Sequence, residues 1–252
     1  MSAETAPPAP LPRYALYYAP RPEETLAVAA SQWLGRNPEP GQARPQRPVP
    51  DITPERLAAI TAEPRLYGFH GTLKAPIALA NGVGERDFVD AIGHFAAKAT
   101  PLAVPALELA EISGFLALIP ATRCPALEDL ADRCVVEFDE FRRPADEAEL
   151  ARRRAAPLTP RQDELLRRWG YPYVLEQWRF HLTLTGRLPD EAERSAVMAV
   201  LGQRFGGFLD RPLPVTDLCV FRQPDAGRPF TVLARFRLGG GRRVRTETWQ
   251  AP

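Results

Sequence analysis

The chain has 252 residues, of which 45% are apolar and 25% are charged, a balance that is ordinary for a globular protein. Its 32 Lys and Arg residues nearly cancel its 31 Asp and Glu residues, and the net charge of +1 argues against long nucleic acid or a membrane surface as partner. No apolar run reaches the roughly 20 residues of a transmembrane helix, and no signal peptide opens the sequence. The three cysteines lack the spacing of a zinc site or a disulfide framework, so we expect a cytoplasmic protein.

Proline is unusually frequent, with 28 residues, and gathers in two stretches. Residues 1–12 are predicted to be a disordered tail, and residues 37–50 an exposed loop. The remainder, residues 13–252, is expected to form a single bilobal domain. Lobe 1 would cover about residues 13–120 and lobe 2 about residues 121–252, and an exchange of strands between the lobes is left open.

Apolar periodicity and capping residues predict the regular elements. In chain order these are a strand at 13–18, helices at 23–34 and 53–61, a strand at 68–76, a helix at 85–97, strands at 106–112 and 114–119, helices at 125–141 and 159–170, a strand at 177–185, a helix at 190–205, and strands at 215–221 and 230–238. The Arg-rich stretch at 141–157 is predicted to be solvated, with recruitment of phosphate by Arg152, Arg153 and Arg154 as the lesser alternative.

The order strand, helix, strand, strand occurs twice, at 68–119 and at 179–238. This repeat indicates two copies of one βαββ unit. Mixed helices and hairpin-linked strands are typical of the α+β class. We therefore expect two antiparallel sheets related by a pseudo-twofold axis, with helices outside and a cleft at the centre.

Two of the three histidines lie in nearly identical pentads. His70 lies in FHGTL and His181 in FHLTL, whereas His94 has no such neighbours and is expected at a surface or interface. Side chains two apart on a strand share a face. The polar face of the first strand then consists of His70, Thr72 and Lys74. That of the second consists of Arg179, His181, Thr183 and Thr185.

Two imidazoles facing each other across a cleft suit phosphodiester chemistry. A neutral histidine can take a proton from the attacking oxygen, and a protonated one can give a proton to the leaving alkoxide. The hydroxyls of Thr72 and Thr183 can donate hydrogen bonds to the phosphoryl oxygens. Lys74 and Arg179 are candidates for neutralising the phosphate, while the assignment of base and acid stays open.

These residues resemble the 2H phosphoesterase superfamily, and in particular its DUF1045-type branch of phosphonate metabolism proteins. The matching stretches are RYALYYAP, SQWLGR, RLYGFHGTLKAPIALA and WRFHLTLTGRL. The resemblance implies a bilobal fold, a reaction at a cyclic phosphodiester or an RNA end, and a catalytic set of His70, Thr72, His181 and Thr183. It also implies a small phosphorylated substrate, such as a ribose cyclic phosphate, other phosphonate-pathway enzymes as partners, and no cofactor or metal.

The sequence leaves open the role of the tyrosines and the choice between several functions. The tyrosines that could line a wall of the cleft are Tyr14, Tyr18, Tyr67, Tyr171 and Tyr173, of which Tyr18 and Tyr67 are the predicted substrate contacts. Aromatic residues on strands also form cores, so both interpretations stay open. An RNA-processing enzyme of the same superfamily and a non-catalytic phosphate-binding protein are the competing functions. A metal site built on the two histidines is a weaker alternative, because no carboxylate stands at a suggestive spacing from either.

Overall fold

The computed structural model describes residues 11–39, 41–240 and 243–244, so the expected tail at 1–12 lies almost entirely outside the described residues. Ten strands are present in these ranges. They are β1 (Arg13–Tyr18), β2 (Gly71–Ile77), β3 (Leu102–Val104), β4 (Leu107–Ile112), β5 (Phe115–Pro120), β6 (Leu182–Thr183), β7 (Leu213–Val215), β8 (Asp217–Gln223), β9 (Thr231–Arg237) and β10 (Arg243–Val244).

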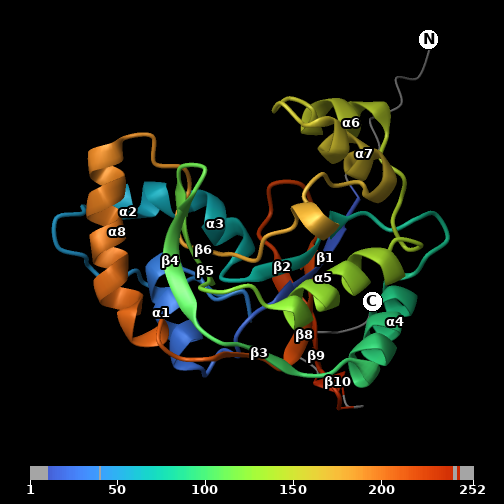
Figure 1. Ribbon diagram of the computed structural model, residues 1–252, viewed down its shortest axis with the longest axis horizontal. Helices are drawn as coiled ribbons and strands as arrows, with labels where there is room; N and C mark the ends of the chain where they lie inside the picture. Colours follow the sequence, from blue (N-terminus) through green and yellow to red (C-terminus); the bar gives the residue numbers. More distant parts are fainter. Residues whose placement is uncertain (1–10, 40, 241–242, 245–252) are drawn as a thin grey trace, which may run out of the picture.

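The helices occupy the segments between these strands (Figure 1). They are α1 (Thr25–Leu34), α2 (Pro54–Ile60), α3 (Ala62–Tyr67), α4 (Glu85–Lys98), α5 (Pro125–Glu137), α6 (Glu147–Arg153), α7 (Pro160–Trp169) and α8 (Glu191–Phe205), with short 3₁₀ turns η1 (Leu175–Gln177) and η2 (Gly206–Phe208). The α+β class that the sequence predicts is therefore the observed one.

One continuous antiparallel sheet replaces the two sheets that the sequence predicted. Its strand order is β10-β9-β8-β1-β2-β6-β5-β4, and β3 and β7 form a separate two-stranded ribbon. The two parts of the sheet meet where β2 pairs with β6 through Gly71 and Leu182. Each half of the sheet combines strands from early and late in the chain, since β8 pairs with β1 and β5 pairs with β6.

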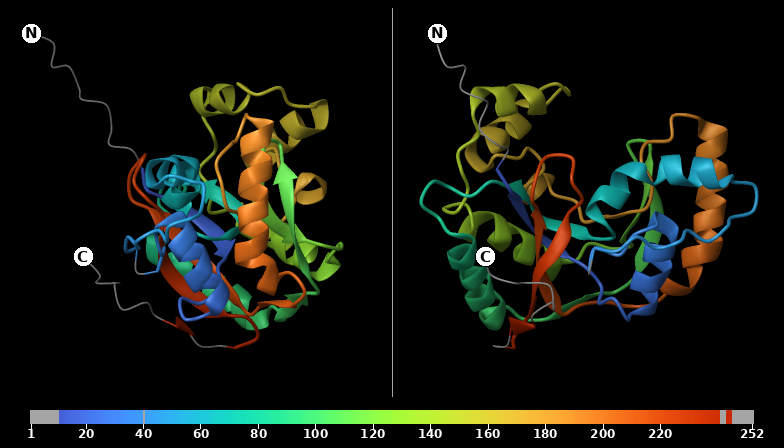
Figure 2. Two further views of the ribbon diagram at one scale, coloured as in Figure 1. Left: turned by 90° about the vertical axis from the view of Figure 1, so that its left-hand side faces the viewer. Right: turned by 180° about the vertical axis from the view of Figure 1, so that it is seen from behind.

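The helices cover different parts of this sheet. Helices α4 and α5 pack against β9, β8 and β2, whereas α8 packs against β4 and β5 at the other end. The pair α6 and α7 stands apart from the sheet above α5, as the views in Figure 2 make clear. The junction of β2 and β6 therefore lies between the strands that α4 covers and the strands that α8 covers.

Alternation along β1 divides its side chains between two clusters. Tyr14, Leu16 and Tyr18 are buried in the main core, while Ala15 and Tyr17 join a smaller cluster with residues of β8 and β9. This period of two is what a strand with both faces covered requires. The side chain of Tyr17 therefore lies on the opposite face of the sheet from that of Tyr18.

Three expected elements differ from the observed ones. The strand predicted at 177–185 is reduced to β6, because its backbone groups bond outside a ladder: Arg179 O accepts from the His181 ring, and Leu184 O accepts from Trp33 Nε1. The helix predicted at 125–141 ends at Glu137. The stretch predicted to be solvated contains α6, which has no buried residue and is capped by Asp146.

Candidate active site

The two histidine motifs meet in one pocket at the middle of the sheet. The pocket has a volume of about 410 Å³. Its lining includes all four residues of the expected catalytic set, His70, Thr72, His181 and Thr183. Segments more than a hundred residues apart in the sequence thus converge at the junction of β2 and β6.

The register of this junction places each histidine beside the threonine of the other motif. Gly71 is paired with Leu182 in the antiparallel sense. Continuing that register by one residue in each direction sets His70 opposite Thr183 and Thr72 opposite His181. The site is therefore built crosswise, and each half of it combines an imidazole from one motif with a hydroxyl from the other.

Both imidazole rings are held in the same way. Nδ1 of His70 lies 2.9 Å from Gly68 O, and Nδ1 of His181 lies 2.8 Å from Arg179 O. A carbonyl oxygen can only accept, so in each ring Nδ1 carries the hydrogen and donates it. Each Nε2 is then left to accept or donate a proton in the pocket.

Aromatic rings surround His70. The ring of Tyr17 stacks on the imidazole with centroids 4.0 Å apart, and the ring of Tyr67 lies on it at 5.6 Å. Burial lowers the pKa of His70 to about 4, the hydrogen bond to Gly68 opposes this shift, and the nearby His181 adds to it. His70 is therefore a neutral imidazole around neutral pH.

His181 has a less enclosed setting. Its nearest aromatic neighbour is Phe115, with centroids 5.7 Å apart. Burial lowers the pKa of His181 as well, and the hydrogen bond to Arg179 O opposes that shift. The two rings thus share a mode of attachment but differ in their surroundings.

Tryptophan side chains fix the backbone of both motifs. Trp33 of α1 is fully buried and donates from Nε1 to Leu184 O at 2.7 Å. Trp178, which precedes the second motif, donates from Nε1 to Thr72 O at 2.8 Å and so ties that segment to β2. Hydrogen bonds from rigid indoles limit the movement of the motifs, which favours a preorganised site.

Of the two tyrosines expected at the cleft, the structure brings only one to it. Tyr67, at the end of α3, lines the pocket. Tyr18 is 2% exposed in the main core and does not line it. Tyr17 lines the pocket instead, because the face of β1 toward the site carries the odd-numbered residues.

Lys74 and Arg179, the expected phosphate contacts, lie beside the pocket and not in its lining. Lys74 is buried under α5, donates from Nζ to Val135 O at 2.9 Å, and has its pKa lowered to about 8 by that burial. Arg179 is exposed and lines a neighbouring hollow that also includes His181 and Trp178. His94 is exposed on α4, away from the site, as expected.

Sequence reasoning missed several residues of the pocket. These are Arg13, Phe115 and Arg187, and for Arg153 and Tyr171, which also line the pocket, a role at the site was only one of two interpretations. Arg153 and Tyr171 come from the segment around α6 and α7, and the guanidinium of Arg153 lies over the Tyr171 ring at 5.3 Å. No spacing in the sequence could reveal them, because only the tertiary fold brings this segment to β2.

The described residues were also compared with the requirements of a metal site and of a membrane-spanning helix. Within residues 11–39, 41–240 and 243–244, no group of three or more His, Cys, Asp or Glu side chains is placed to hold a metal ion. In the same ranges, every helix is too short or too polar to cross a lipid bilayer.

Comparison with known proteins gives two curated relatives that share one name. A protein of Janthinobacterium sp. (strain Marseille) named ribose 1,5-bisphosphate phosphokinase PhnN is 37% identical over 232 residues, which cover 90% of this chain and 51% of that protein. A protein of Laribacter hongkongensis (strain HLHK9) with the same name is 35% identical over 244 residues, which cover 94% of this chain and 55% of that protein. The chain spans about half the length of these relatives.

The solved structures that resemble the chain are more distant. E. coli LigT complexed with NADP+ is 14% identical, with a TM-score of 0.42 and coverage of 92% of this chain and 99% of LigT. A structure described as a phosphoesterase is 16% identical, with a TM-score of 0.40 and coverage of 91% and 98%. A family model described as "Protein of unknown function (DUF1045)" matches residues 72–231, more than half of the sequence, and the chain belongs to this family.

Proposed function

We propose that this chain is a metal-independent phosphodiesterase that opens a small cyclic phosphodiester, with His70 as general base and His181 as general acid. The observation that carries the proposal is the matched attachment of the two rings, each of which donates from Nδ1 to the carbonyl two residues earlier. This leaves two Nε2 atoms for proton transfer in one pocket, beside two threonine hydroxyls.

The proposed reaction balances without a cofactor. Nε2 of neutral His70 takes a proton from water while the water oxygen bonds to phosphorus. The bond from phosphorus to one ester oxygen breaks, and Nε2–H of protonated His181 delivers its proton to that oxygen. The product is a phosphomonoester, and exchange with solvent restores both rings. Thr72 and Thr183 donate hydrogen bonds to the non-bridging oxygens, where negative charge increases.

The assignment of base and acid follows from the surroundings of the rings. A general base must be neutral before reaction, and the more enclosed His70 has a pKa of about 4. His181 lies on the more open side, near Arg187 and the hollow lined by Arg179. An anionic phosphate bound there favours the imidazolium form of this ring.

The experiment is hydrolysis of a small panel in the presence of EDTA. Ribose 1,2-cyclic phosphate 5-phosphate is the preferred substrate, since the name of the relatives points to phosphorylated ribose. Nucleoside 2′,3′-cyclic phosphates and a 2′,5′-linked dinucleotide represent RNA processing. We expect His70→Ala and His181→Ala each to lower kcat about 10²–10⁴-fold, and His94→Ala, at an exposed position on α4, to leave it unchanged.

Other outcomes select other functions. Turnover that EDTA abolishes contradicts the metal-independent mechanism. Turnover of the dinucleotide or of RNA ends alone favours the RNA-processing reading, and binding without any turnover favours a phosphate-binding protein.

The phosphokinase named for the relatives is a second candidate, to be tested by adding ATP and a ribose phosphate. The sequence of this chain gives it no phosphate-binding loop of the GxxxxGK[ST] type, because its two lysines, Lys74 and Lys98, follow Leu73 and Ala97 and not glycine. Phosphoryl transfer from ATP that survives His70→Ala would support this second candidate and contradict the first.

A further inference from the structure

A second recess of about 660 Å³ adjoins the histidine pocket. The two hollows share five lining residues, Arg13, Ala75, Pro76, Arg153 and Tyr171. Because these residues form a common boundary, a ligand that occupies the histidine pocket can extend past Arg13 and Arg153 into the recess. Any group attached to the substrate on this side would enter it.

Most of the charged residues that line the recess are positive. Its cationic residues are Arg13, Lys74, Arg142, Arg143, Arg152 and Arg153. The acidic residues in the lining are Asp146 and Glu149. The chain as a whole has a net charge of only +1, so this excess of cations is local and marks the recess as a place for an anion.

The cations differ in how far they are already paired. Arg142 is held by Asp139, with Nε 2.7 Å from Oδ1, and it also donates to Arg168 O. Arg13 donates to the neutral amide of Gln223, and its guanidinium lies over the Phe230 ring at 5.6 Å.

Two arginines of the recess form no close ion pair among the described residues. Arg152 lies 3.9 Å from Glu149, beyond hydrogen-bond distance, and Glu149 is more closely paired with Arg153 at 3.0 Å. Arg143 is exposed, and among the described residues no carboxylate pairs with it. Arg143 and Arg152 can therefore turn to an incoming anion without breaking a close ion pair.

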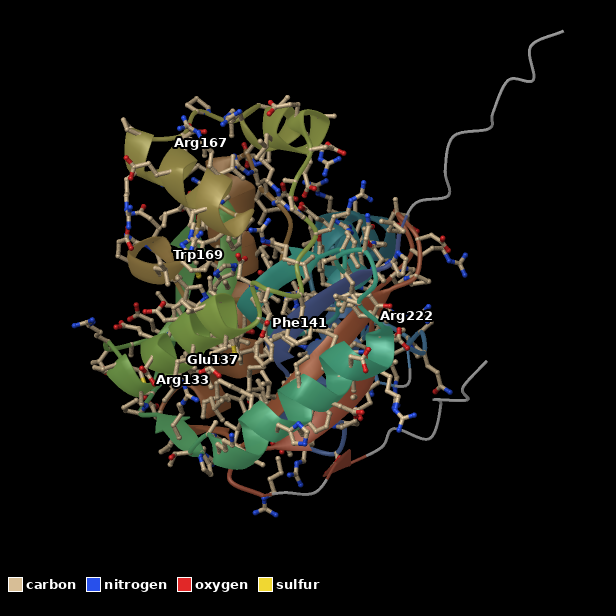
Figure 3. All side chains as sticks on the ribbon, turned by 90° about the vertical axis from the view of Figure 1, so that its right-hand side faces the viewer. Arg133, Glu137, Phe141, Arg167, Trp169 and Arg222 are labelled. Carbon is tan, nitrogen blue, oxygen red and sulfur yellow. The ribbon has the colours of Figure 1, made fainter. Side chains whose placement is uncertain are left out.

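Helix α6, which carries Arg152, is linked to α7 by an ion pair in which Nε of Arg154 lies 2.7 Å from Oδ1 of Asp163. Leu165 of α7 packs against Val135 of α5 and Val174, with Trp169 against the same cluster. Figure 3 shows Trp169 between α7 and α5, whereas Arg167 lies at the outside of α7. A capping box at Thr159 and Gln162 fixes the start of α7. The α7 side of the recess is thus held by core contacts, and α6 is attached to it through Arg154 and Asp163.

We propose that this recess binds a second phosphate group of the substrate, a phosphomonoester remote from the cyclic phosphodiester that reacts at the histidines. The inference rests on the proposed function and defines its substrate class as a cyclic phosphodiester that also carries a terminal phosphate. Planar guanidinium groups bind phosphate oxygens in pairs, which suits Arg143 and Arg152 to this task. The remote phosphate orients the cyclic ester between His70 and His181.

A matched pair of substrates tests the proposal. Ribose 1,2-cyclic phosphate would be compared with and without the 5-phosphate, using wild type and the double variant Arg143→Gln/Arg152→Gln. We expect the variant to lose at least tenfold in kcat/KM for the phosphorylated substrate and to keep its value for the other. Arg167→Gln, on the outside of the same helix pair, is the matched control and should change neither value. An equal loss for both substrates, or none for either, overturns the proposal.

A binding measurement separates this inference from the proposed reaction. Ribose 5-phosphate would be titrated into wild type, His181→Ala and the double variant by calorimetry at two salt concentrations. We expect salt-sensitive binding to the first two proteins and binding at least tenfold weaker to the third. If this pattern appears while no cyclic phosphate is hydrolysed, phosphate binding in the recess is supported and the proposed reaction is contradicted. If wild type does not bind the probe, or the double variant binds it equally well, the recess proposal is wrong.

Discussion

A Cβ atom on Gly71 would lie 2.2 Å from the ring of Phe180, so these two residues can coexist only because position 71 lacks a side chain. Phe180 precedes His181, and its ring packs under the first motif. This contact explains why the first pentad reads FHGTL where the second reads FHLTL. The equivalent position, Leu182, is fully buried and has no such constraint.

Gly71→Ala should therefore damage both stability and activity. The Phe180 ring would have to move, at a cost of about 1–3 kcal/mol in the free energy of unfolding, and His181 would move with it. Urea unfolding and kcat/KM would measure the two effects. Gly202→Ala is the control, since nothing lies within 4 Å of a Cβ at that position in α8 and alanine should stabilise the helix slightly. Wild-type values for Gly71→Ala would contradict the contact.

Substitutions of the adjacent tyrosines Tyr17 and Tyr18 of β1 should have different effects on activity. Tyr17→Leu removes the ring stacked on His70 and should lower kcat/KM. Tyr18→Phe removes a buried hydroxyl that has no hydrogen-bond partner among the described residues, so stability should stay level or rise by about 1 kcal/mol, with activity unchanged. Steady-state kinetics and thermal unfolding of both variants check the pair. A larger loss of activity in Tyr18→Phe would reverse our placement of the two rings.

The pH profile of kcat/KM should have an acidic maximum. The base must be neutral, so activity should rise with pH through the pKa of His70, about 4. The acid must be protonated, so activity should fall as His181 loses its proton, and burial places the pKa of that ring below its ordinary 6.5. Initial rates at low substrate between pH 3.5 and 8.5 give the profile. A maximum above pH 7 would contradict this pairing of base and acid.

Stability should fall as the pH is lowered below neutrality. The folded state holds His70 neutral with a pKa of about 4, while the unfolded chain binds its proton near the ordinary 6.5. This contribution is complete above pH 6.5 and is lost progressively as the pH falls toward 4. Urea midpoints at pH 7 and pH 5 should differ less in His70→Gln than in wild type. His94→Gln, at an exposed site, should keep the wild-type difference.

The paired motifs were predictable from sequence because their information is local. A period of two on a strand predicts that His70 and Thr72 share a face, and capping residues predict α7, whose capping box at Thr159 and αL Gly170 the structure confirms. The likeness of the two pentads then places both pairs in one site.

What covers a strand face was not predictable in this way. Lys74 has the right alternation to join His70 and Thr72. However, α5 packs on β2, and the Lys74 ammonium donates a hydrogen bond to Val135 O of that helix. Tyr18 was chosen over Tyr17 because the sequence does not say which face of β1 is turned to the pocket. The single sheet and the arginines around α6 likewise depend on contacts between distant segments, which no local pattern records.

Because each half of the sheet combines early and late strands, neither half of the chain can complete a half of the sheet alone. Strand β8 completes the half of the sheet that begins with β1 and β2, and β6 requires β5 as its neighbour. A break in the loop between β5 and α5 would leave two fragments, each with exposed strand edges and with one histidine and one threonine of the proposed catalytic set. Such fragments should be inert separately and recover activity on mixing, as complementing halves of one enzyme.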